Sequence, residues 1–213
     1  DKDYRAFVRK NAAWLEDYAL FMALKVHYNY GQWTAWAPEH RDYKQAIGHK
    51  AEFEGEMSFW RWVQYEFAAQ WKDVVVRAHQ KGIKIIGDMP IYVSPDGADI
   101  WANPELFQLD EKNMPTAVAG CPPDAFSATG QLWGNPLYDW AEMEKDGFSW
   151  WKERISFALE LFDGVRIDHF RGFESFWSVK GTEKTAKNGK WVKGPGMKLI
   201  KVFNEVKGDK LII

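Results

Sequence analysis

The residues best suited to chemistry are an arginine and an aspartate within segment 162–173, Phe-Asp-Gly-Val-Arg-Ile-Asp-His-Phe-Arg-Gly-Phe. Arg166 and Asp168 alternate with Val165 and Ile167, as in a half-buried strand, so the two polar side chains should share a face. The neighbouring guanidinium would keep the Asp168 carboxylate ionised, which is the state that a nucleophilic carboxylate needs. An ordinary ion pair at the end of a strand explains this segment equally well.

A second aspartate ends another predicted strand. Apolar residues at helical spacing predict a helix over 58–79, with Ser58 as its N-cap and Gly82 after its end. The β-branched run that follows predicts a short buried strand over 83–88, which ends at Asp88. Helix, glycine, strand and carboxylate together are typical of one unit of an α/β fold with a parallel sheet.

A second unit of the same kind positions Asp168. Residues 149–161 have the pattern of an amphipathic helix, and the strand at 165–168 follows. Ligand chemistry gathers at the carboxyl ends of parallel strands, so Asp88 and Asp168 on two such strands favour one site over two separate ion pairs.

The remaining elements are predicted from the same periodicities. We expect helical structure over 4–26 with a break near Asn11, a short helix over 39–47 and another over 197–206. Residues 211–213 should begin a further strand.

A long connection over 91–148 separates the two units and is rich in Pro, Gly and aromatic residues. A connection of this length in a compact domain indicates a function, and stiff loops with stacking and amide side chains suit a polyhydroxylated ligand. Trp101 and Trp140 are better explained as packing residues. Trp133 beside Gln131 fits packing and ligand contact equally well.

Composition narrows the function classes. The net charge is −2 without a strongly basic stretch, which argues against nucleic-acid binding, and the lysines of 180–196 predict a solvent-exposed loop. No apolar run is long enough to span a membrane, and a single cysteine, Cys121, excludes a disulfide framework, so we expect a soluble cytoplasmic protein. Thirteen tryptophans favour carbohydrate as the ligand.

Five segments together resemble the 4-α-glucanotransferases of glycoside hydrolase family 77, and the resemblance runs from about Phe7 to the end of the chain. The segments are Gly87–Ser94, Asp99–Pro104, Pro122–Ser127, Gly130–Trp140 and Val165–Phe173. The resemblance implies an α/β fold, a partial (β/α)₈ TIM barrel with helical and loop insertions. Residues 1–213 would be a segment of one catalytic barrel domain, in which 1–56 are a helical insertion. Residues 57–213 would be barrel units around strands three to five, with the insertion 91–148.

The resemblance also implies roles for individual residues. Asp168 would be the nucleophile of retaining transfer between α-1,4-glucans, through a covalent glycosyl-Asp intermediate. Six further residues would contact substrate: Arg166, Asp88, Asp124, Gln131, Trp133 and His169. Strand alternation turns His169 away from the Asp168 face, which gives it the weaker sugar contact. The implied partners are maltooligosaccharides, with no cofactor, nucleic acid or membrane.

Retaining transfer needs two carboxyl groups, one attacking and one protonating the leaving oxygen. In the family the acid/base Glu is expected just after the strand that begins at 211, so we expect an internal fragment that is inactive alone. Two alternatives remain, a hydrolase of the same clan and a non-catalytic maltooligosaccharide-binding fragment. A metal site made of Asp88, Asp168 and His169 is disfavoured, because His169 should face away from Asp168.

Overall fold

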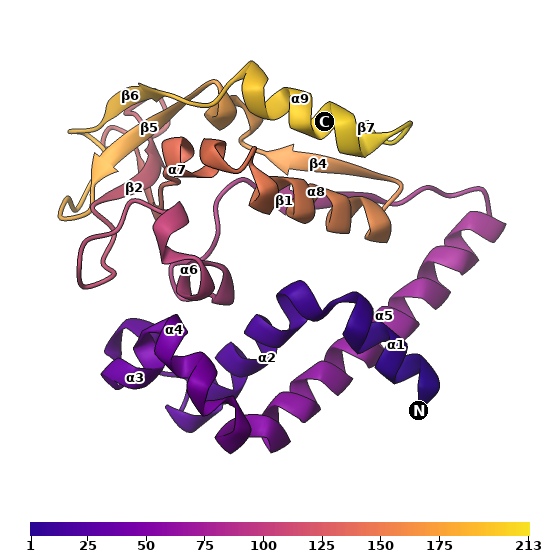
Figure 1. Ribbon diagram of the computed structural model, residues 1–213. Helices are drawn as coiled ribbons and strands as arrows, with labels where there is room; N and C mark the ends of the chain where they lie inside the picture. The colour runs from indigo at the N-terminus through magenta and orange to yellow at the C-terminus, as the bar shows by residue number, and fades with distance from the viewer. The chain divides into compact units, whose positions relative to one another are not determined.

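The computed structural model describes residues 1–213 and has a mixed α/β fold (Figure 1). The chain divides into two compact units, residues 1–77 with 96–103 and residues 78–95 with 104–213. None of its helices combines the length and the apolar character needed to cross a membrane.

The first unit is helical. Its elements are α1 (Lys2–Lys10), α2 (Ala12–His27), η1 (Trp33–Ala35), α3 (Pro38–Arg41), α4 (Tyr43–Ala46), η2 (Ile47–Phe53), most of α5 (Glu54–Gln80) and α6 (Ala98–Ala102). The predicted break at Asn11 is confirmed, and short helices occupy the predicted region 39–47. The core contains Leu15, Leu20, Leu24, Trp33, Met57, Ile100 and Trp101. Trp101 is fully buried and donates from Nε1 to the His40 carbonyl at 3.1 Å, as expected for a packing residue.

Helix α5 differs from its prediction in both start and burial. It begins at Glu54, and Ser58 lies inside it, where its hydroxyl donates to Glu54 Oε1 at 3.0 Å; the predicted N-cap at Ser58 is therefore wrong. No residue of the predicted apolar stripe is fully buried, and Phe59 and Phe67 are about half accessible. The helix instead buries Arg61, whose guanidinium bonds the carboxylate of Glu16 on α2 at 2.7 and 2.9 Å.

The second unit contains a three-stranded parallel sheet of order β1-β4-β7, formed by β1 (Ile86–Pro90), β4 (Gly164–Asp168) and β7 (Leu211–Ile212). The predicted parallel strands are thus confirmed. However, β1 starts three residues later than predicted, and its first residue, Ile86, is exposed. The partial barrel remains a prediction.

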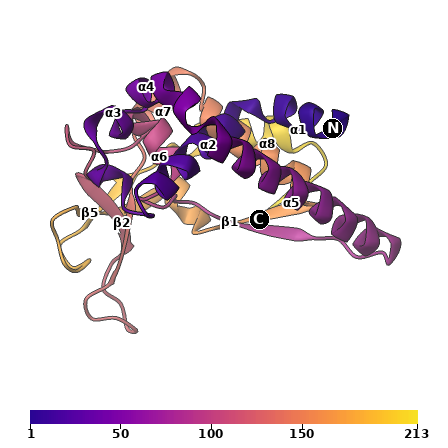
Figure 2. The same cartoon turned by 90° about the horizontal axis from the view of Figure 1, so that it is seen from below.

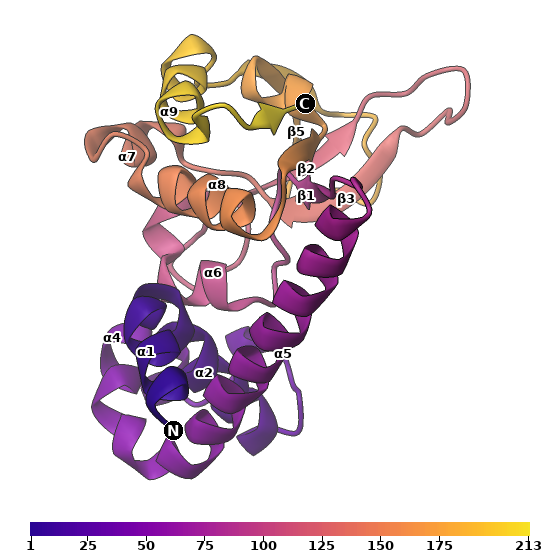
Figure 3. The ribbon, with the colours of Figure 1, turned by 90° about the vertical axis from the view of Figure 1, so that its right-hand side faces the viewer.

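Helices α8 (Ser149–Leu161) and α9 (Met197–Lys207) lie side by side along this sheet (Figures 1 and 3). Trp151 and Ile155 form the buried face of α8, and the rings of Trp151 and Phe203 on α9 are 5.8 Å apart. Burial of this stripe accounts for the agreement between predicted and observed bounds of α8.

The long connection 91–148 is structured. It contains η3 (Pro104–Leu106), β2 (Ala117–Cys121), β3 (Gln131–Pro136) and α7 (Trp140–Lys145) besides α6. Strands β2 and β3 pair with β5 (Ser175–Lys180) and β6 (Lys190–Lys193) in an antiparallel sheet of order β3-β2-β5-β6. The loop predicted over 180–196 therefore includes a strand, because β6 pairs with β5 along its whole length. The segment between β2 and β3 reaches away from the sheet (Figures 2 and 3).

Candidate active site

The centre of the site is an arginine shared by two carboxylates. Arg166 Nη1 donates to both oxygens of Asp88, at 2.7 and 2.9 Å, and Nη2 donates to Asp168 Oδ1 at 2.6 Å. The planar fork of a guanidinium suits this arrangement, because its N–H groups point in fixed directions. Oδ2 of Asp168 accepts no hydrogen bond within the chain, so one oxygen remains available to a ligand.

The pairing of β1 with β4 brings these side chains together. The parallel register places Asp88 opposite Arg166 and Pro90 opposite Asp168. On β4, Val165 and Ile167 are buried while Arg166 and Asp168 are exposed, as the sequence alternation predicts. The two strands lie next to each other near the middle of the unit (Figure 1). Strand pairing therefore explains how Asp88 reaches the guanidinium of Arg166, 78 positions later in the chain.

The Asp88–Arg166–Asp168 triad is open to solvent. The side chain of Asp168 is 59% exposed, and that of Arg166 is 49% exposed. The hydrogen bonds to Asp88, and then those to Asp168, raise the pKa of Arg166 above its ordinary value. The arginine thus stays a fixed positive charge beside a carboxylate that a ligand can reach.

An aromatic wall forms from Trp133 on β3 and from His169, which directly follows β4. The two rings meet edge to face with centroids 4.9 Å apart and an interplanar angle of 88°. Trp133 Nε1 donates to Gln131 Oε1 at 3.1 Å, which orients the indole. The structure therefore brings three predicted ligand-contact residues together, Gln131, Trp133 and His169. His169 directly follows Asp168 in the chain and so places this group beside it.

His169 departs from strand geometry. Its φ is 56°, in the left-handed region that non-glycine residues seldom adopt, and β4 ends one residue before it. The strand alternation used to orient His169 therefore does not extend to it. Burial lowers the pKa of the imidazole, and Nε2 is buried without a hydrogen-bond partner.

Tyr92 supports the aromatic wall and was not predicted. It is 6% exposed and lies 6.3 Å, ring to ring, from both Trp133 and His169. It stacks on Tyr138, whose hydroxyl donates to the Ile91 carbonyl at 2.7 Å. The apolar run Ile91-Tyr92-Val93 directly after β1 was the available signal, since such a run must be buried.

Asp124 makes no hydrogen bond or ion pair with the other predicted residues. Its Oδ1 accepts from the backbone N–H groups of Phe126 and Ser127, at 2.9 and 2.8 Å. These bonds close a turn in the segment between β2 and β3, and no hydrogen bond or ion pair joins Asp124 to the Asp88–Arg166–Asp168 triad. An Asp that caps its own turn is a common structural role.

Metal-ligating side chains are not grouped in the structure. No set of three or more His, Cys, Asp or Glu residues is arranged to hold a metal ion. The guanidinium between Asp88 and Asp168 occupies the position that a cation would need between these two carboxylates.

Comparison with known proteins places this geometry in a family. The family model described as 4-alpha-glucanotransferase, glycoside hydrolase family 77, matches residues 1–213. A 4-alpha-glucanotransferase of Clostridium butyricum is 50% identical over 216 residues, which cover 100% of this chain and 44% of that protein. One of Thermus thermophilus is 49% identical over 208 residues, covering 97% of this chain and 42% of that protein. The chain thus spans less than half the length of these relatives.

Solved structures agree with the sequence comparison. The amylomaltase from Streptococcus agalactiae in complex with acarbose matches with a TM-score of 0.90 and 39% identity, covering 98% of this chain and 43% of that one. The amylomaltase from Corynebacterium glutamicum matches with a TM-score of 0.75 at 20% identity, over 95% of this chain and 26% of that one, which shows a shared fold. Because the family model matches all 213 residues of this chain, the chain belongs to the 4-α-glucanotransferases of glycoside hydrolase family 77.

Proposed function

We propose that this chain carries the nucleophile and part of the sugar-binding surface of a retaining 4-α-glucanotransferase. The observation that supports it most directly is Arg166 bridging Asp88 and Asp168. Asp168 would attack the anomeric carbon of an α-1,4-glucan through Oδ2, forming a glycosyl ester as the leaving sugar departs. The 4-OH of a second glucan would then displace Asp168 and complete the transfer.

Arg166 and Asp88 would act as positioning residues. Arg166 fixes one oxygen of Asp168 at 2.6 Å, so the direction of the other oxygen is fixed as well. Asp88 holds the other side of the guanidinium and prevents it from turning away. Each oxygen of Asp88 has a second lone pair, through which it would accept a hydrogen bond from a sugar hydroxyl.

The aromatic wall would hold the sugar ring. Trp133 is 36% exposed, enough to offer a face for stacking, while Gln131 beside it can hydrogen-bond a hydroxyl. The Nε2 atom of His169 is buried without a partner, so a sugar hydroxyl would bond it only after the imidazole ring turns toward the ligand. The resemblance gives Asp124 a sugar contact too, through its second oxygen, since Oδ1 closes the turn.

The general acid would be a carboxyl group outside the triad. Asp88 is the carboxyl group that shares the Arg166 guanidinium with Asp168. Both oxygens of Asp88 accept hydrogen bonds from Arg166, so Asp88 is poorly suited to donate a proton. We therefore infer that these 213 residues alone transfer glucan slowly. We also propose that β1, β4 and β7 are consecutive strands of a (β/α)₈ barrel, with residues 1–56 as an insertion.

The nucleophile assignment is tested by Asp168→Asn in the full-length protein, with Asp73→Asn on α5 as a matched control. Disproportionation of maltotriose should fall by about 10³-fold or more for Asp168→Asn and stay unchanged for the control. A fluorinated maltosyl fluoride should lose its anomeric fluoride on attack and leave the fluorinated maltosyl group as an ester on the peptide containing Asp168. A label on any other carboxylate would refute the assignment.

A glucan-binding role without catalysis is the second candidate, and the exposed Trp133 favours it. In that case Trp133→Ala would abolish maltooligosaccharide binding while Asp168→Asn left both binding and any residual activity unchanged. A hydrolase would give glucose and maltose alone from maltotriose, whereas a transferase also gives longer oligomers.

A further inference from the structure

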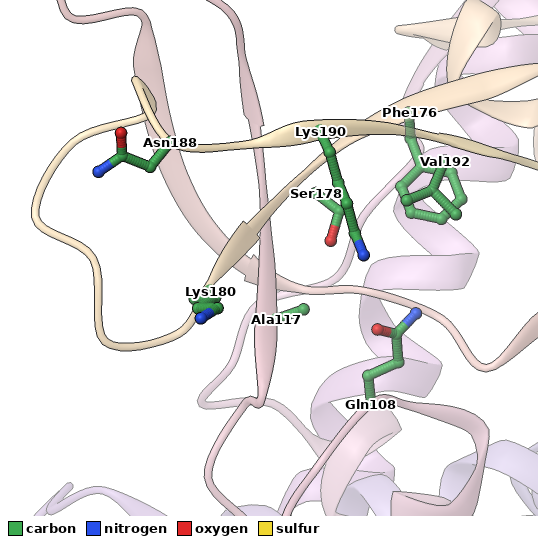
Figure 4. A pocket seen from close by; sticks show the side chains of 8 residues that line it. All are labelled: Gln108, Ala117, Phe176, Ser178, Lys180, Asn188, Lys190 and Val192. Carbon is green, nitrogen blue, oxygen red and sulfur yellow. The ribbon is translucent and has the colours of Figure 1, made fainter.

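A pocket of about 390 Å³ lies on the antiparallel sheet, remote from the proposed catalytic residues. Its floor is the face of β5 and β6 that carries Phe176, Ser178, Lys180, Lys190 and Val192 (Figure 4). The volume falls in the range of about 300–1,000 Å³ that is typical of small-molecule sites. It shares no residue with the Asp88–Arg166–Asp168 triad or the aromatic wall.

The charged residues that line the pocket are all positive. Lys180 and Lys190 line it, and none of its lining residues is an Asp or Glu. Neither ammonium has a hydrogen-bond or ion-pair partner within the chain, unlike Lys25 and Lys50, which both pair with carboxylates. Two unpaired cations in one concave site leave a positive potential that an anion would neutralise.

Strand register holds the two lysines near each other. Lys190 pairs with Ser178, two residues before Lys180, so the lysines are diagonal neighbours on one face, about 7–8 Å apart at the backbone. Like charges at this separation repel, and an anion between them removes the repulsion. The positions are set by the β5–β6 ladder and not by a mobile loop.

Neutral groups complete the lining. The Ser178 hydroxyl lies between the lysine positions and has no partner within the chain, and the Gln108 amide points toward the same space as the Lys190 ammonium (Figure 4). Gln108 is anchored because its Nε2 donates to the Tyr138 carbonyl at 3.0 Å, which leaves Oε1 open to a ligand donor. Phe176, 2% exposed, and Val192 supply an apolar wall.

We propose that this pocket binds a phosphate monoester, with the dianion between Lys180 and Lys190 and its sugar against Phe176 and Val192. A phosphate carries close to two negative charges, which matches two ammonium groups, and its oxygens accept from Ser178 as well. A neutral glucan would leave both lysines unpaired. A nucleic acid would need a continuous basic surface, whereas the pocket holds two cations in a chain of net charge −2.

Titration of the full-length protein with inorganic phosphate, glucose 6-phosphate and glucose, followed by calorimetry, tests the proposal. Glucose 6-phosphate should bind with an affinity that depends on Lys180 and Lys190, whereas any binding of glucose at the aromatic wall should not depend on these lysines. The double variant Lys180→Gln/Lys190→Gln should lose about tenfold or more in affinity. Lysine-dependent binding that is tighter for the ester than for phosphate would support a sugar phosphate as the ligand, and equal binding would overturn the sugar contact assigned to Phe176 and Val192.

The matched control is Lys187→Gln/Lys193→Gln, which removes the same charge. Lys193 lies on β6 next to Val192, so it faces away from the pocket, and Lys187 is in the adjoining loop. The control should keep its affinity, and both variants should keep the urea midpoint of the parent. Equal loss in both variants, or no binding of either phosphate probe, would overturn the proposal. Its failure would leave the assignment of Asp168 unaffected, because the two sites share no residue.

Discussion

At the scale of single residues, the site depends on the geometry of one guanidinium. Arg166 uses Nη1 for Asp88 and Nη2 for Asp168, so its two arms hold two strands and one proposed nucleophile at once. A lysine has a single ammonium and cannot reproduce two fixed directions. The charge is therefore only part of what Arg166 contributes.

Arg166→Lys should lower transfer by about 10²-fold, because Asp168 would lose its fixed orientation although a positive charge remains. Steady-state kinetics with maltotriose should show the loss in kcat more than in KM. Arg9→Lys on the exposed face of α1 is the control and should behave like the parent. Full activity of Arg166→Lys would mean that charge alone suffices.

Prediction at this scale worked where a local rule applied. Arg166 and Asp168 share a face because β4 alternates without interruption, and alternation is readable from four residues. The same rule stopped short of His169, since a left-handed φ of 56° is not encoded by an apolar period. Tyr92 escaped notice because its contacts with Trp133 and His169 come from three separate segments.

At the scale of elements, the β1–β4 pair depends on a close approach at Gly87. A Cβ added there would lie 2.3 Å from the ring of Phe162, which precedes β4. This contact requires the glycine; the backbone conformation does not, because the φ of Gly87 is not positive. The ring and the strand both position Asp88, the next residue.

Gly87→Ala should destabilise the protein by about 1–3 kcal/mol, because Phe162 or the strand must move. Gly55→Ala is a matched control, since nothing lies within 4 Å of its added Cβ and it sits inside α5. Alanine there should stabilise the helix by about 0.5–1 kcal/mol. Urea unfolding of both variants measures the difference, and equal midpoints would contradict the packing assigned to Gly87.

A buried histidine gives the helical unit a pH dependence. His40 is 9% exposed, its Nδ1 is 2.8 Å from the Tyr28 hydroxyl, and the rings of His49 and His27 lie 5.3 and 5.7 Å away. Burial, and then the neighbouring His49, lower the pKa of His40 below its ordinary value of 6.5, although Glu39 and Glu52 act in the opposite direction. The folded state therefore binds a proton less readily than the unfolded state.

The free energy of unfolding should fall as the pH decreases below 6.5, because unfolding then takes up a proton at His40. The stabilising effect is complete above that pH and is lost toward the lower pKa of the folded state. His40→Asn should reduce this slope in urea unfolding between about pH 7.5 and 5. A residual slope of the same sign is expected from His169, whose pKa is also lowered. An unchanged slope would contradict the role of His40.

Element prediction depended on how much of each signal was local. The predicted bounds of α8 agree with the observed ones because the apolar residues on one face of this helix are buried within the second unit. The predicted start of α5 is too late because the helix continues directly from η2. Its aromatic stripe is only partly buried, whereas Arg61, which binds Glu16 and Glu54, is buried. The sheet β3-β2-β5-β6 was not anticipated, since β2 and β5 pair across more than 50 residues.

At the scale of the whole molecule, the proposed nucleophile Asp168 shares the Arg166 guanidinium with one other carboxylate, Asp88. Asp88 is held by Arg166 at both oxygens, and burial lowers the pKa of His169 in the aromatic wall, which makes its imidazole a poor proton donor. Losing general acid help costs about 10²–10⁴-fold for a poor leaving group such as a sugar hydroxyl. Fluoride leaves without a proton, so an activated donor bypasses that requirement.

The 213-residue chain should therefore disproportionate maltotriose at least about 10²-fold more slowly than its full-length Clostridium butyricum relative. With α-maltotriosyl fluoride the gap should narrow by at least about tenfold, because Asp168 can attack without an acid. Asp168→Asn in the same chain should abolish the fluoride reaction, and Asp73→Asn should not. If the 213-residue chain disproportionated maltotriose as fast as the full-length relative, the general acid would lie within these residues. Equal deficits with both donors would mean that Asp168 is not oriented for attack.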